Sequence, residues 1–127
     1  MNPPAQKPMV LFVEDAPLIV TLVEEALREG GFGVTVALDG PAAQAELMSG
    51  VEFQGLVLDI NFPGPLNGWD LARMARTQFP HIAIVYATGE VEPEWTVEGV
   101  PGSVLISKPY APAQAITALA QQLNTAG

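Results

Sequence analysis

The sequence predicts an α/β fold, a doubly wound five-stranded parallel sheet with helices on both faces. Five short apolar segments alternate along the chain with segments of helical periodicity. The apolar segments are continuous rather than alternating, which is typical of parallel strands covered on both faces. The 12 glycines and 12 prolines fall between these segments, where they separate the elements. A chain of 127 residues is one domain of ordinary size.

The first strand is expected at Met9–Val13, followed by a helix whose apolar stripe runs from Ile19 to Leu27. Asp15 is the expected N-cap of that helix, Pro17 lies in its first turn, and Gly30-Gly31 ends it. The next elements are expected as a strand at 33–38, a helix at 41–48, a strand at 56–59 and a helix at 69–78. The last ones are strands at 82–86 and 104–106 and a helix at 113–123.

Between the last two strands the pattern weakens. The segment Glu90–Gly102 holds Pro93, Gly99 and Pro101, so we expect any helix there to be short or irregular. We assign residues 1–8 to a flexible N-terminal extension, 9–123 to the domain and 124–127 to a C-terminal tail.

Composition excludes several classes of protein. Fourteen acidic residues against five basic ones give a formal charge of −9, which leaves no basic surface for nucleic acid or for an anionic membrane. With no cysteine and one histidine, the chain cannot form disulfides, cysteine-based sites or a histidine-rich metal site. No signal peptide or membrane-spanning segment is evident, so we expect a cytoplasmic protein.

Polar residues stand at the carboxyl ends of four predicted strands. Glu14-Asp15 follows the first strand, Asp59 ends the third, Thr88 follows the fourth and Lys108 follows the fifth. In a doubly wound sheet, ligands bind beyond the carboxyl ends of the strands. Three carboxylates, one hydroxyl and one ammonium are therefore expected on one face.

These groups predict a magnesium site that handles phosphate. Three carboxylates and one lysine sum to −2, and like charges at close range need a cation between them. Carboxylates and carbonyls are oxygen donors, which suit Mg²⁺. Lys108 and the Thr88 hydroxyl would then face the oxygens of a phosphoryl group, with an aspartate as the nucleophile.

The chain resembles a response regulator receiver domain of two-component signalling over Met9 to Leu123, with the flavodoxin-like form of the predicted fold. Each motif that carries the resemblance is weak alone, but together they occur in the right order at the predicted strand ends. They are Val13-Glu14-Asp15, Leu58-Asp59-Ile60-Asn61, Pro63, Gly68, Ala87-Thr88-Gly89 and Ser107-Lys108-Pro109.

The resemblance implies roles for the matching residues. Asp59 is the phosphoacceptor, Thr88 and Lys108 contact the phosphoryl group, and the Lys108–Pro109 peptide bond is cis. Mg²⁺ is the implied cofactor, held by Asp59, directly by Asp15, through water by Glu14 and by the backbone carbonyl of Asn61. Gly89 keeps the approach to the site open, and Asn61 and Glu90 tune the access of hydrolytic water.

Two features depart from the usual receiver pattern. Leu105 stands where receivers usually carry a switch tyrosine or phenylalanine, and the aromatic Tyr110 comes two residues after Lys108. The run Tyr86-Ala-Thr-Gly resembles a subgroup with a Phe-Ala-Thr-Gly-type motif, which lacks the aromatic switch and has a poorly ordered fourth helix. The loop after Asp59 also reaches Gly68 one residue later than usual, which should leave Asp59 in place.

We therefore expect a stand-alone receiver that takes a phosphoryl group on Asp59 and signals by a phosphorylation-dependent protein contact. The resemblance implies a histidine kinase or a histidine phosphotransfer protein as the partner, no nucleic acid or membrane, and a monomer or weak phosphorylation-dependent dimer. It implies no enzyme activity beyond assisting its own phosphorylation and dephosphorylation.

Three alternatives stay open at this point. The first is a receiver excised from a hybrid kinase or larger regulator. The second is a pseudo-receiver that binds partners without being phosphorylated. The third is a small phosphatase of the haloacid-dehalogenase type, which Asn61 disfavours because that family has aspartate at this position.

Overall fold

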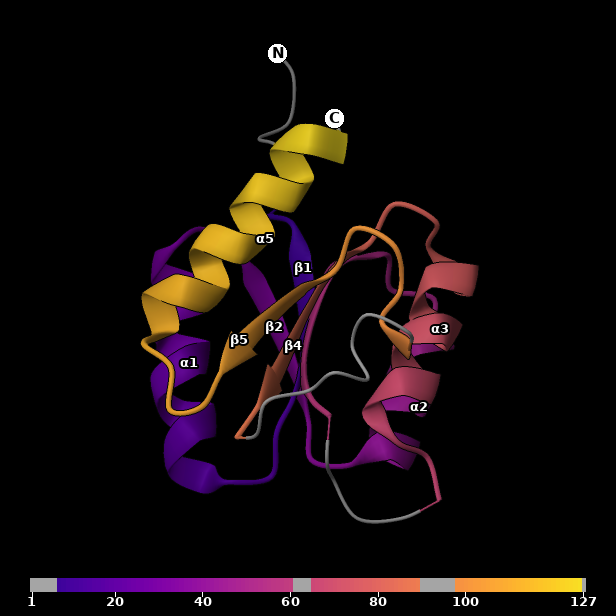
Figure 1. Ribbon diagram of the computed structural model, residues 1–127, viewed down its shortest axis with the longest axis horizontal. Coiled ribbons are helices and arrows are strands. Elements are labelled where there is room, and N and C mark those ends of the chain that lie inside the picture. The colour runs from indigo at the N-terminus through magenta and orange to yellow at the C-terminus, as the bar shows by residue number, and fades with distance from the viewer. Residues whose placement is uncertain (1–6, 61–64, 90–97, 127) are drawn as a thin grey trace.

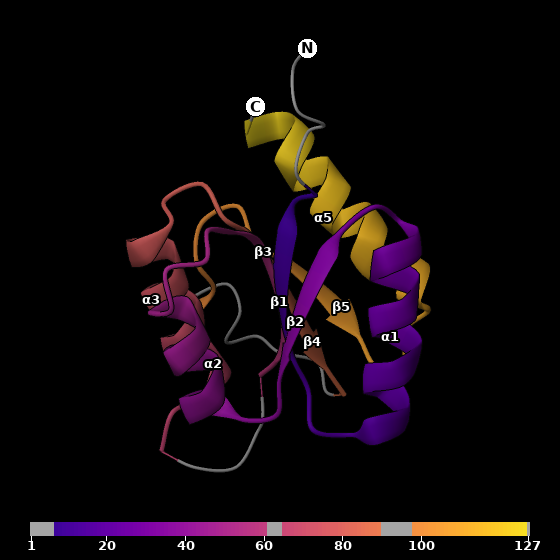
Figure 2. The same ribbon diagram turned by 180° about the vertical axis from the view of Figure 1, so that it is seen from behind.

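The computed structural model describes residues 7–60, 65–89 and 98–126. Within them, five strands form one parallel sheet with the order β2-β1-β3-β4-β5 (Figures 1 and 2). The strands are β1 (Met9–Val13), β2 (Gly33–Ala37), β3 (Phe53–Asp59), β4 (Ala83–Thr88) and β5 (Val104–Ser107). The helices are α1 (Pro17–Glu29), α2 (Gly40–Leu47), α3 (Gly68–Gln78) and α5 (Pro112–Ala126). The predicted doubly wound fold is confirmed.

The two faces of the sheet carry separate helix layers. α1 and α5 cover one face, and α2 and α3 cover the other (Figure 2). Successive residues of β1 alternate between them, since Val10 and Phe12 join the α1 and α5 core while Leu11 and Val13 join the α2 and α3 core. All four side chains are buried, so these strands read as continuous apolar runs in the sequence.

Parallel register brings the carboxyl ends of the central strands to one edge of the sheet. Val13 pairs with Leu58, Asp59 pairs with Ala87, and Thr88 pairs with Ser107. The beginning of β1 and the end of α5 lie at the opposite edge (Figure 1). The residues that follow these strands, including Glu14 and Lys108, are therefore placed together by the sheet itself.

The element bounds differ from the predicted ones by a few residues. β3 begins at Phe53 instead of Leu56, and α5 continues to Ala126, so most of the expected tail is helical. Residues 99–103 form no helix or strand, in line with the predicted irregularity, whereas residues 90–97 lie outside the described residues. None of the described helices is both long and apolar enough to cross a bilayer.

The start of α1 differs from the prediction. Ala16 is the N-cap and makes no side-chain cap hydrogen bond, so the expected capping by Asp15 is wrong. The Glu14 carboxylate instead accepts the backbone N–H groups of Asp15 and Ala16, both at 3.1 Å, which satisfies two donors just before the helix. Pro17 opens the helix, as predicted, because its missing N–H has no helical partner to lose. The carboxylate that binds these two N–H groups is thus also one of the site carboxylates.

Gly68 fixes the start of α3 against the end of β3. Its N–H donates to the carbonyl of Ile60 at 3.1 Å. A Cβ atom at this position would lie 2.7 Å from the Ile60 Cα and 2.8 Å from the Asp59 carbonyl oxygen, closer than real contacts allow. Only a glycine lets α3 begin directly beside the backbone that carries Asp59.

We expect Gly68→Ala to lower the free energy of unfolding by about 1–3 kcal/mol, because the added methyl group must displace backbone atoms. Urea denaturation measures the change. Gly89→Ala is the matched control, since a Cβ there meets none of the described residues within 4 Å and should leave the midpoint within the error of the measurement. Equal midpoints for wild type and Gly68→Ala would contradict this account of the α3 start.

Candidate functional site

Four of the predicted site residues meet at the carboxyl edge of the sheet. Glu14 and Asp15 follow β1, Asp59 ends β3, and Lys108 follows β5. The ammonium group of Lys108 donates to Asp59 Oδ2 at 2.7 Å and to Glu14 Oε1 at 3.1 Å. One lysine therefore joins two carboxylates that are 45 positions apart in the sequence.

Burial makes this contact different from a surface ion pair. The side chain of Glu14 is 2% exposed, that of Asp59 is 16% exposed and that of Lys108 is 22% exposed. A charged carboxylate in such surroundings is stable only with a cation and hydrogen-bond donors against it. Glu14 has both, because Lys108 binds one of its oxygens and two backbone N–H groups bind the other.

The two carboxylates also hold the proton on Lys108. Burial on its own would lower the pKa of Lys108, but the hydrogen bonds and charges of Asp59 and Glu14 outweigh it. The pKa of Lys108 is therefore raised above its ordinary value of 10.5, and the side chain is an ammonium at any physiological pH.

Backbone contacts fix the position of Lys108 relative to Thr88. The N–H of Lys108 donates to the Thr88 carbonyl at 2.7 Å, directly after the paired residues Thr88 and Ser107. Thr88 is 1% exposed and ends β4 beside Asp59. The Lys108–Pro109 peptide bond is cis, as the family resemblance implies. Asp59, Thr88 and Lys108 thus lie at the carboxyl ends of three neighbouring strands.

The donor chemistry fits Mg²⁺, although the described residues do not form a complete set of ligands. Among them, no group of three carboxylate or imidazole side chains is arranged to hold a metal ion. The available donors are oxygens, the ligand type that Mg²⁺ prefers, and Asp15 is exposed next to the buried Glu14. Glu14, Asp15 and Asp59 less the charge of Lys108 leave −2 at this edge, which a divalent cation would neutralise.

Two of the predicted site residues, Asn61 and Glu90, lie outside the described residues. Part of the longer loop after Asp59 lies there too, but Asp59 keeps its place at the end of β3. Leu105 pairs in register with Tyr86 and is half-buried against the α2 and α3 core. The position of the usual switch aromatic is therefore filled by a packed aliphatic side chain.

Tyr110 is the aromatic residue beside the site. Its ring packs against the α1 and α5 core, and its hydroxyl oxygen is buried without a hydrogen-bond partner among the described residues. Burial and then the negative charges of Glu14 and Asp59 raise the pKa of Tyr110 above its ordinary value of 10.0. A phenol here stays neutral, since its anion would face two carboxylates.

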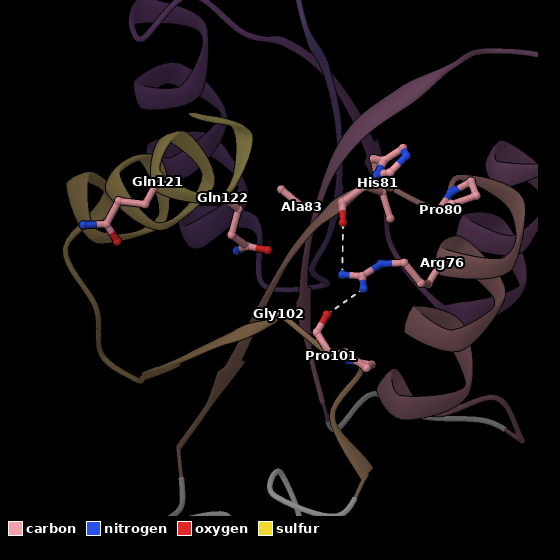
Figure 3. Close-up of a pocket in the computed structure, with 9 residues that line it drawn as sticks. Arg76, Pro80, His81, Ala83, Pro101, Gly102, Gln121 and Gln122 are labelled. Carbon is pink, nitrogen blue, oxygen red and sulfur yellow. Dashed lines mark hydrogen bonds between the residues drawn. The ribbon is translucent and has the colours of Figure 1, made fainter. Parts of the chain in front are cut away.

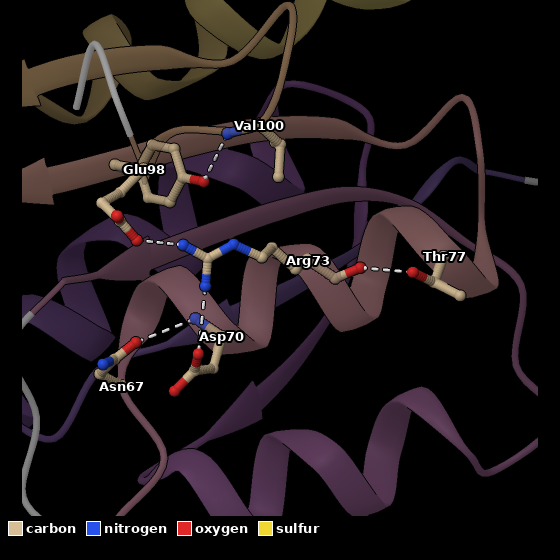
Figure 4. A network of polar contacts seen from close by, with 7 residues as sticks. Asn67, Asp70, Arg73, Thr77, Glu98 and Val100 are labelled. Atoms are coloured by element: carbon tan, nitrogen blue, oxygen red, sulfur yellow. Dashed lines mark hydrogen bonds and ion pairs between the residues drawn. The ribbon is translucent and has the colours of Figure 1, made fainter. Parts of the chain in front are cut away.

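A polar network between α3 and the residues before β5 was not predicted from the sequence. Arg73 pairs with Asp70 and with Glu98, and the N–H of Val100 donates to the hydroxyl of Tyr86 (Figure 4). Little in the sequence indicates this network, because arginines on a helix and a glutamate 25 positions after Arg73 are common surface residues.

A surface cavity of about 340 Å³ lies at the opposite edge of the sheet, between α3 and α5 (Figure 3). Arg76 lines it and donates to the carbonyls of Pro101 at 2.6 Å and Ile82 at 3.1 Å. The single histidine, His81, is exposed here. Because it precedes β4 while Asp59 ends β3, His81 lies away from the candidate site.

Comparisons with known proteins agree with this geometry. The family model described as response regulator receiver domain matches residues 10–120. A response regulator receiver protein from Sinorhizobium medicae is 38% identical, with a TM-score of 0.91 over 96% of this chain and 98% of that one. The chemotaxis protein CheY of Pseudomonas aeruginosa is 32% identical over 80% of this chain and 84% of that protein.

A third solved structure is similar to this chain in fold but has low sequence identity. The receiver domain of the P. aeruginosa sensor histidine kinase PA1611 is 23% identical, with a TM-score of 0.78 over 93% of this chain and 98% of that one. That protein carries a magnesium ion in its active-site cleft. The chain spans about half the length of other curated relatives, namely 45% of PetR of Rhodobacter capsulatus and 52% of RegX3 of Mycobacterium tuberculosis.

The raised pKa values at the site predict a loss of stability at alkaline pH. In the unfolded chain Tyr110 ionises near its ordinary pKa of 10.0, whereas the folded chain keeps the proton to higher pH. The folded state then binds more protons, so the free energy of unfolding falls as pH rises above about 10, by at most about 1.4 kcal/mol per pH unit for one such group. Urea titrations at several pH values measure this slope.

Tyr110→Phe removes one titrating group and should make the alkaline slope shallower, while the contribution of Lys108 remains. The variant and the wild type should show the same pH dependence below pH 9, where neither group titrates. An identical slope for both proteins above pH 10 would show that Tyr110 is not held neutral in the folded state.

Proposed function

The chain belongs to the response regulator receiver domain family, and we propose that it accepts a phosphoryl group on Asp59 from a phosphorylated histidine of a partner protein. The observation that carries the proposal is the contact of Lys108 with both Asp59 and Glu14. A lysine held between two carboxylates at the carboxyl edge of a parallel sheet is positioned to balance the charge of an incoming phosphoryl group.

In the proposed transfer, an oxygen of the Asp59 carboxylate attacks phosphorus, and the bond between phosphorus and the donor nitrogen breaks. The product is an aspartyl phosphate. Lys108 is then the cation beside the new negative charge, and the Thr88 hydroxyl is the nearby hydrogen-bond donor from β4. Positioning and charge neutralisation supply most of the catalysis in phosphoryl transfer, so a small site of this kind is sufficient.

We further propose that Mg²⁺ binds through Asp15 and Asp59, with Glu14 as a partner through water and the carbonyl of Asn61 as an additional ligand. Support comes from the oxygen donors, from the net charge of −2 and from the magnesium ion that the PA1611 receiver domain carries. A bound Mg²⁺ supplies a positive charge that favours phosphate oxygens close to the carboxylates.

The partner is proposed to approach over the apolar residues of α1 next to the site. Leu18 is 72% exposed and Leu22 is 51% exposed, on a chain whose other large apolar side chains are mostly buried. A cavity of about 370 Å³ beside them is lined by Ile19, Lys108 and Tyr110 among others. A histidine kinase or phosphotransfer protein that bound here would bring its histidine to the edge where Asp59 lies.

We propose a receiver that acts without a fused output domain, supported by the S. medicae protein and CheY, of which this chain covers 98% and 84%. PetR and RegX3 favour the alternative of a larger regulator, because this chain covers only about half of each. The reading frame of the gene tests the two. In either case the phosphorylated state is expected to be read through a protein contact.

Asp59→Asn should abolish covalent phosphorylation, because an amide oxygen cannot form the acyl phosphate. Intact-protein mass after incubation with acetyl phosphate and Mg²⁺, or with candidate kinases, measures the gain of one phosphoryl group. Asp39→Asn is the matched control, since asparagine also caps the start of α2 and the residue lies outside the site. Wild type that gains no phosphoryl group from any donor, or Asp59→Asn that gains one, would contradict the proposal.

Glu14→Gln should weaken Mg²⁺ binding by about 10–100-fold, the usual effect of removing a partner that acts on a metal site through water. Isothermal titration calorimetry of the metal-free protein with MgCl₂ measures the affinity. Glu25→Gln removes the same charge from the exposed side of α1 and should leave the affinity within about twofold. Equal losses in both variants would indicate general surface charge instead of a defined site.

A further inference from the structure

We propose that Tyr86 is a positioning residue that couples the phosphoacceptor site to residues 98–103, which we call the 98–103 turn. The coupling is made by the Tyr86 hydroxyl on the backbone of Val100 and by the Tyr86 ring on Trp69. The inference rests on the proposed function, and it names how the state of that site reaches the rest of the molecule.

The position of Tyr86 connects it with Thr88. Both residues lie on β4, and because they are two positions apart their side chains leave the same face of the sheet. Tyr86 is fully buried between Leu58 on β3 and Leu105 on β5, its register partners. A displacement of the end of β4 toward a phosphoryl group on Asp59 therefore acts on a fully buried ring in a close-packed core.

Trp69 connects the same ring with the backbone of Asp59. The ring centroids of Trp69 and Tyr86 are 4.8 Å apart, within the usual range of aromatic pairs. Trp69 follows Gly68, whose N–H binds the Ile60 carbonyl and whose Cα leaves no room for a side chain. The start of α3 is thus hydrogen-bonded to the residue after the phosphoacceptor. A shift of that residue would move Trp69, whose ring packs against Tyr86.

The hydroxyl of Tyr86 provides the connection to the 98–103 turn. It accepts the N–H of Val100 at 3.2 Å, and the side chain of Ser103 is a second hydrogen-bond partner. The carbonyl of Val100 accepts the Ser103 hydroxyl at 2.7 Å, so both backbone groups of Val100 are bound. Val100 is 8% exposed and belongs to the α2 and α3 core. Burial raises the pKa of Tyr86, so the hydroxyl stays neutral and keeps this role.

The other contacts of the turn are of a different kind. Arg73 reaches Glu98 and Arg76 reaches the carbonyl of Pro101 (Figure 4 shows the first). The Arg73 and Glu98 side chains are 45% and 41% exposed, and an ion pair this exposed contributes little and is screened by salt. These contacts hold the turn to α3 but do not touch β4. Tyr86 is the buried connection between the turn and the strand that ends in Thr88.

The hydroxyl matters because Leu105 replaces the usual switch aromatic. An aliphatic side chain packed in the core makes no hydrogen bond that could change with phosphorylation. In the subgroup that the Tyr86-Ala-Thr-Gly run resembles, the first position of the motif is phenylalanine, which has the ring without the hydroxyl. This chain therefore adds one polar contact at the place where the end of β4 meets the 98–103 turn.

Amide hydrogen exchange resolved by NMR, on the full chain with and without acetyl phosphate and Mg²⁺, tests the proposal. In the unphosphorylated wild type the Val100 amide should exchange slowly, and Tyr86→Phe should accelerate it about tenfold, the effect of losing one hydrogen bond to a buried group. Phosphorylation should change the Val100 exchange rate severalfold in the wild type and leave it unchanged in Tyr86→Phe. The β1 amides are the internal reference for global stability.

Ser49→Ala is the control, because it removes an exposed hydroxyl just after α2, outside the candidate site, the proposed partner surface and the 98–103 turn. It should keep both the slow Val100 exchange and its response to phosphorylation. Intact mass, measured on the same samples, separates the two ideas. A mass gain with a Val100 rate that responds equally in wild type and Tyr86→Phe, or in neither, overturns the coupling alone. No mass gain, either from acetyl phosphate or from the candidate kinases, overturns the proposed function and the coupling with it.

Discussion

The structure depends on the repulsion between carboxylates at the carboxyl edge of the sheet and on the one ammonium that offsets it. Glu14 is almost completely buried, and its charge is stable there only because Lys108 and two backbone N–H groups bind its oxygens. Asp59 shares the same lysine at 2.7 Å. A divalent cation or a phosphoryl group that enters this edge changes the charge that Lys108 balances. Under the proposed function, Lys108 is the cation that responds to what binds there, and its backbone N–H donates to the Thr88 carbonyl at 2.7 Å.

No single segment of the chain makes this contact; the fold brings distant residues together to form it. Glu14 and Lys108 are 94 positions apart, and Asp59 and Lys108 are 49 apart. Parallel strands with right-handed helical connections bring all of their carboxyl ends to the same edge, so the residue after each strand enters the site without further folding information. Burial of the strands stabilises the fold, and the site is formed by the polar residues that end these strands or directly follow them. Its geometry is rigid because each contributing residue is one or two peptide bonds from a buried strand.

The fold and most of the candidate site could be predicted from the sequence because both depend on where apolar runs end. Met9–Val13 is followed by Glu14, and Val104–Ser107 is followed by Lys108, and no long-range information is needed to see it. The capping of α1 could not be predicted this way. Asp15 has the right residue type, but the chain turns so that Glu14 accepts the N–H groups ahead of the helix. The contact of Tyr86 with Val100 was also out of reach, because it depends on how the 98–103 turn folds back on β4. Asn61 and Glu90 lie outside the described residues, and their assignment still rests on the sequence.

Tyr86 and Tyr110 show how the same residue type serves different ends on the two faces of the sheet. Tyr110 lies on the α1 and α5 side, where burial and then the charges of Glu14 and Asp59 raise its pKa and keep it neutral, and its hydroxyl has no hydrogen-bond partner among the described residues. Tyr86 lies on the α2 and α3 side, where its hydroxyl binds a backbone N–H of the 98–103 turn. A buried hydroxyl without a partner costs free energy, whereas one that satisfies a buried N–H offsets that cost and fixes a position. Of the two hydroxyls, only that of Tyr86 is hydrogen-bonded to another segment among the described residues. A signal that leaves the site on the side of β4 and α3 therefore has a defined polar contact to act on, even though the usual aromatic on β5 is replaced by Leu105.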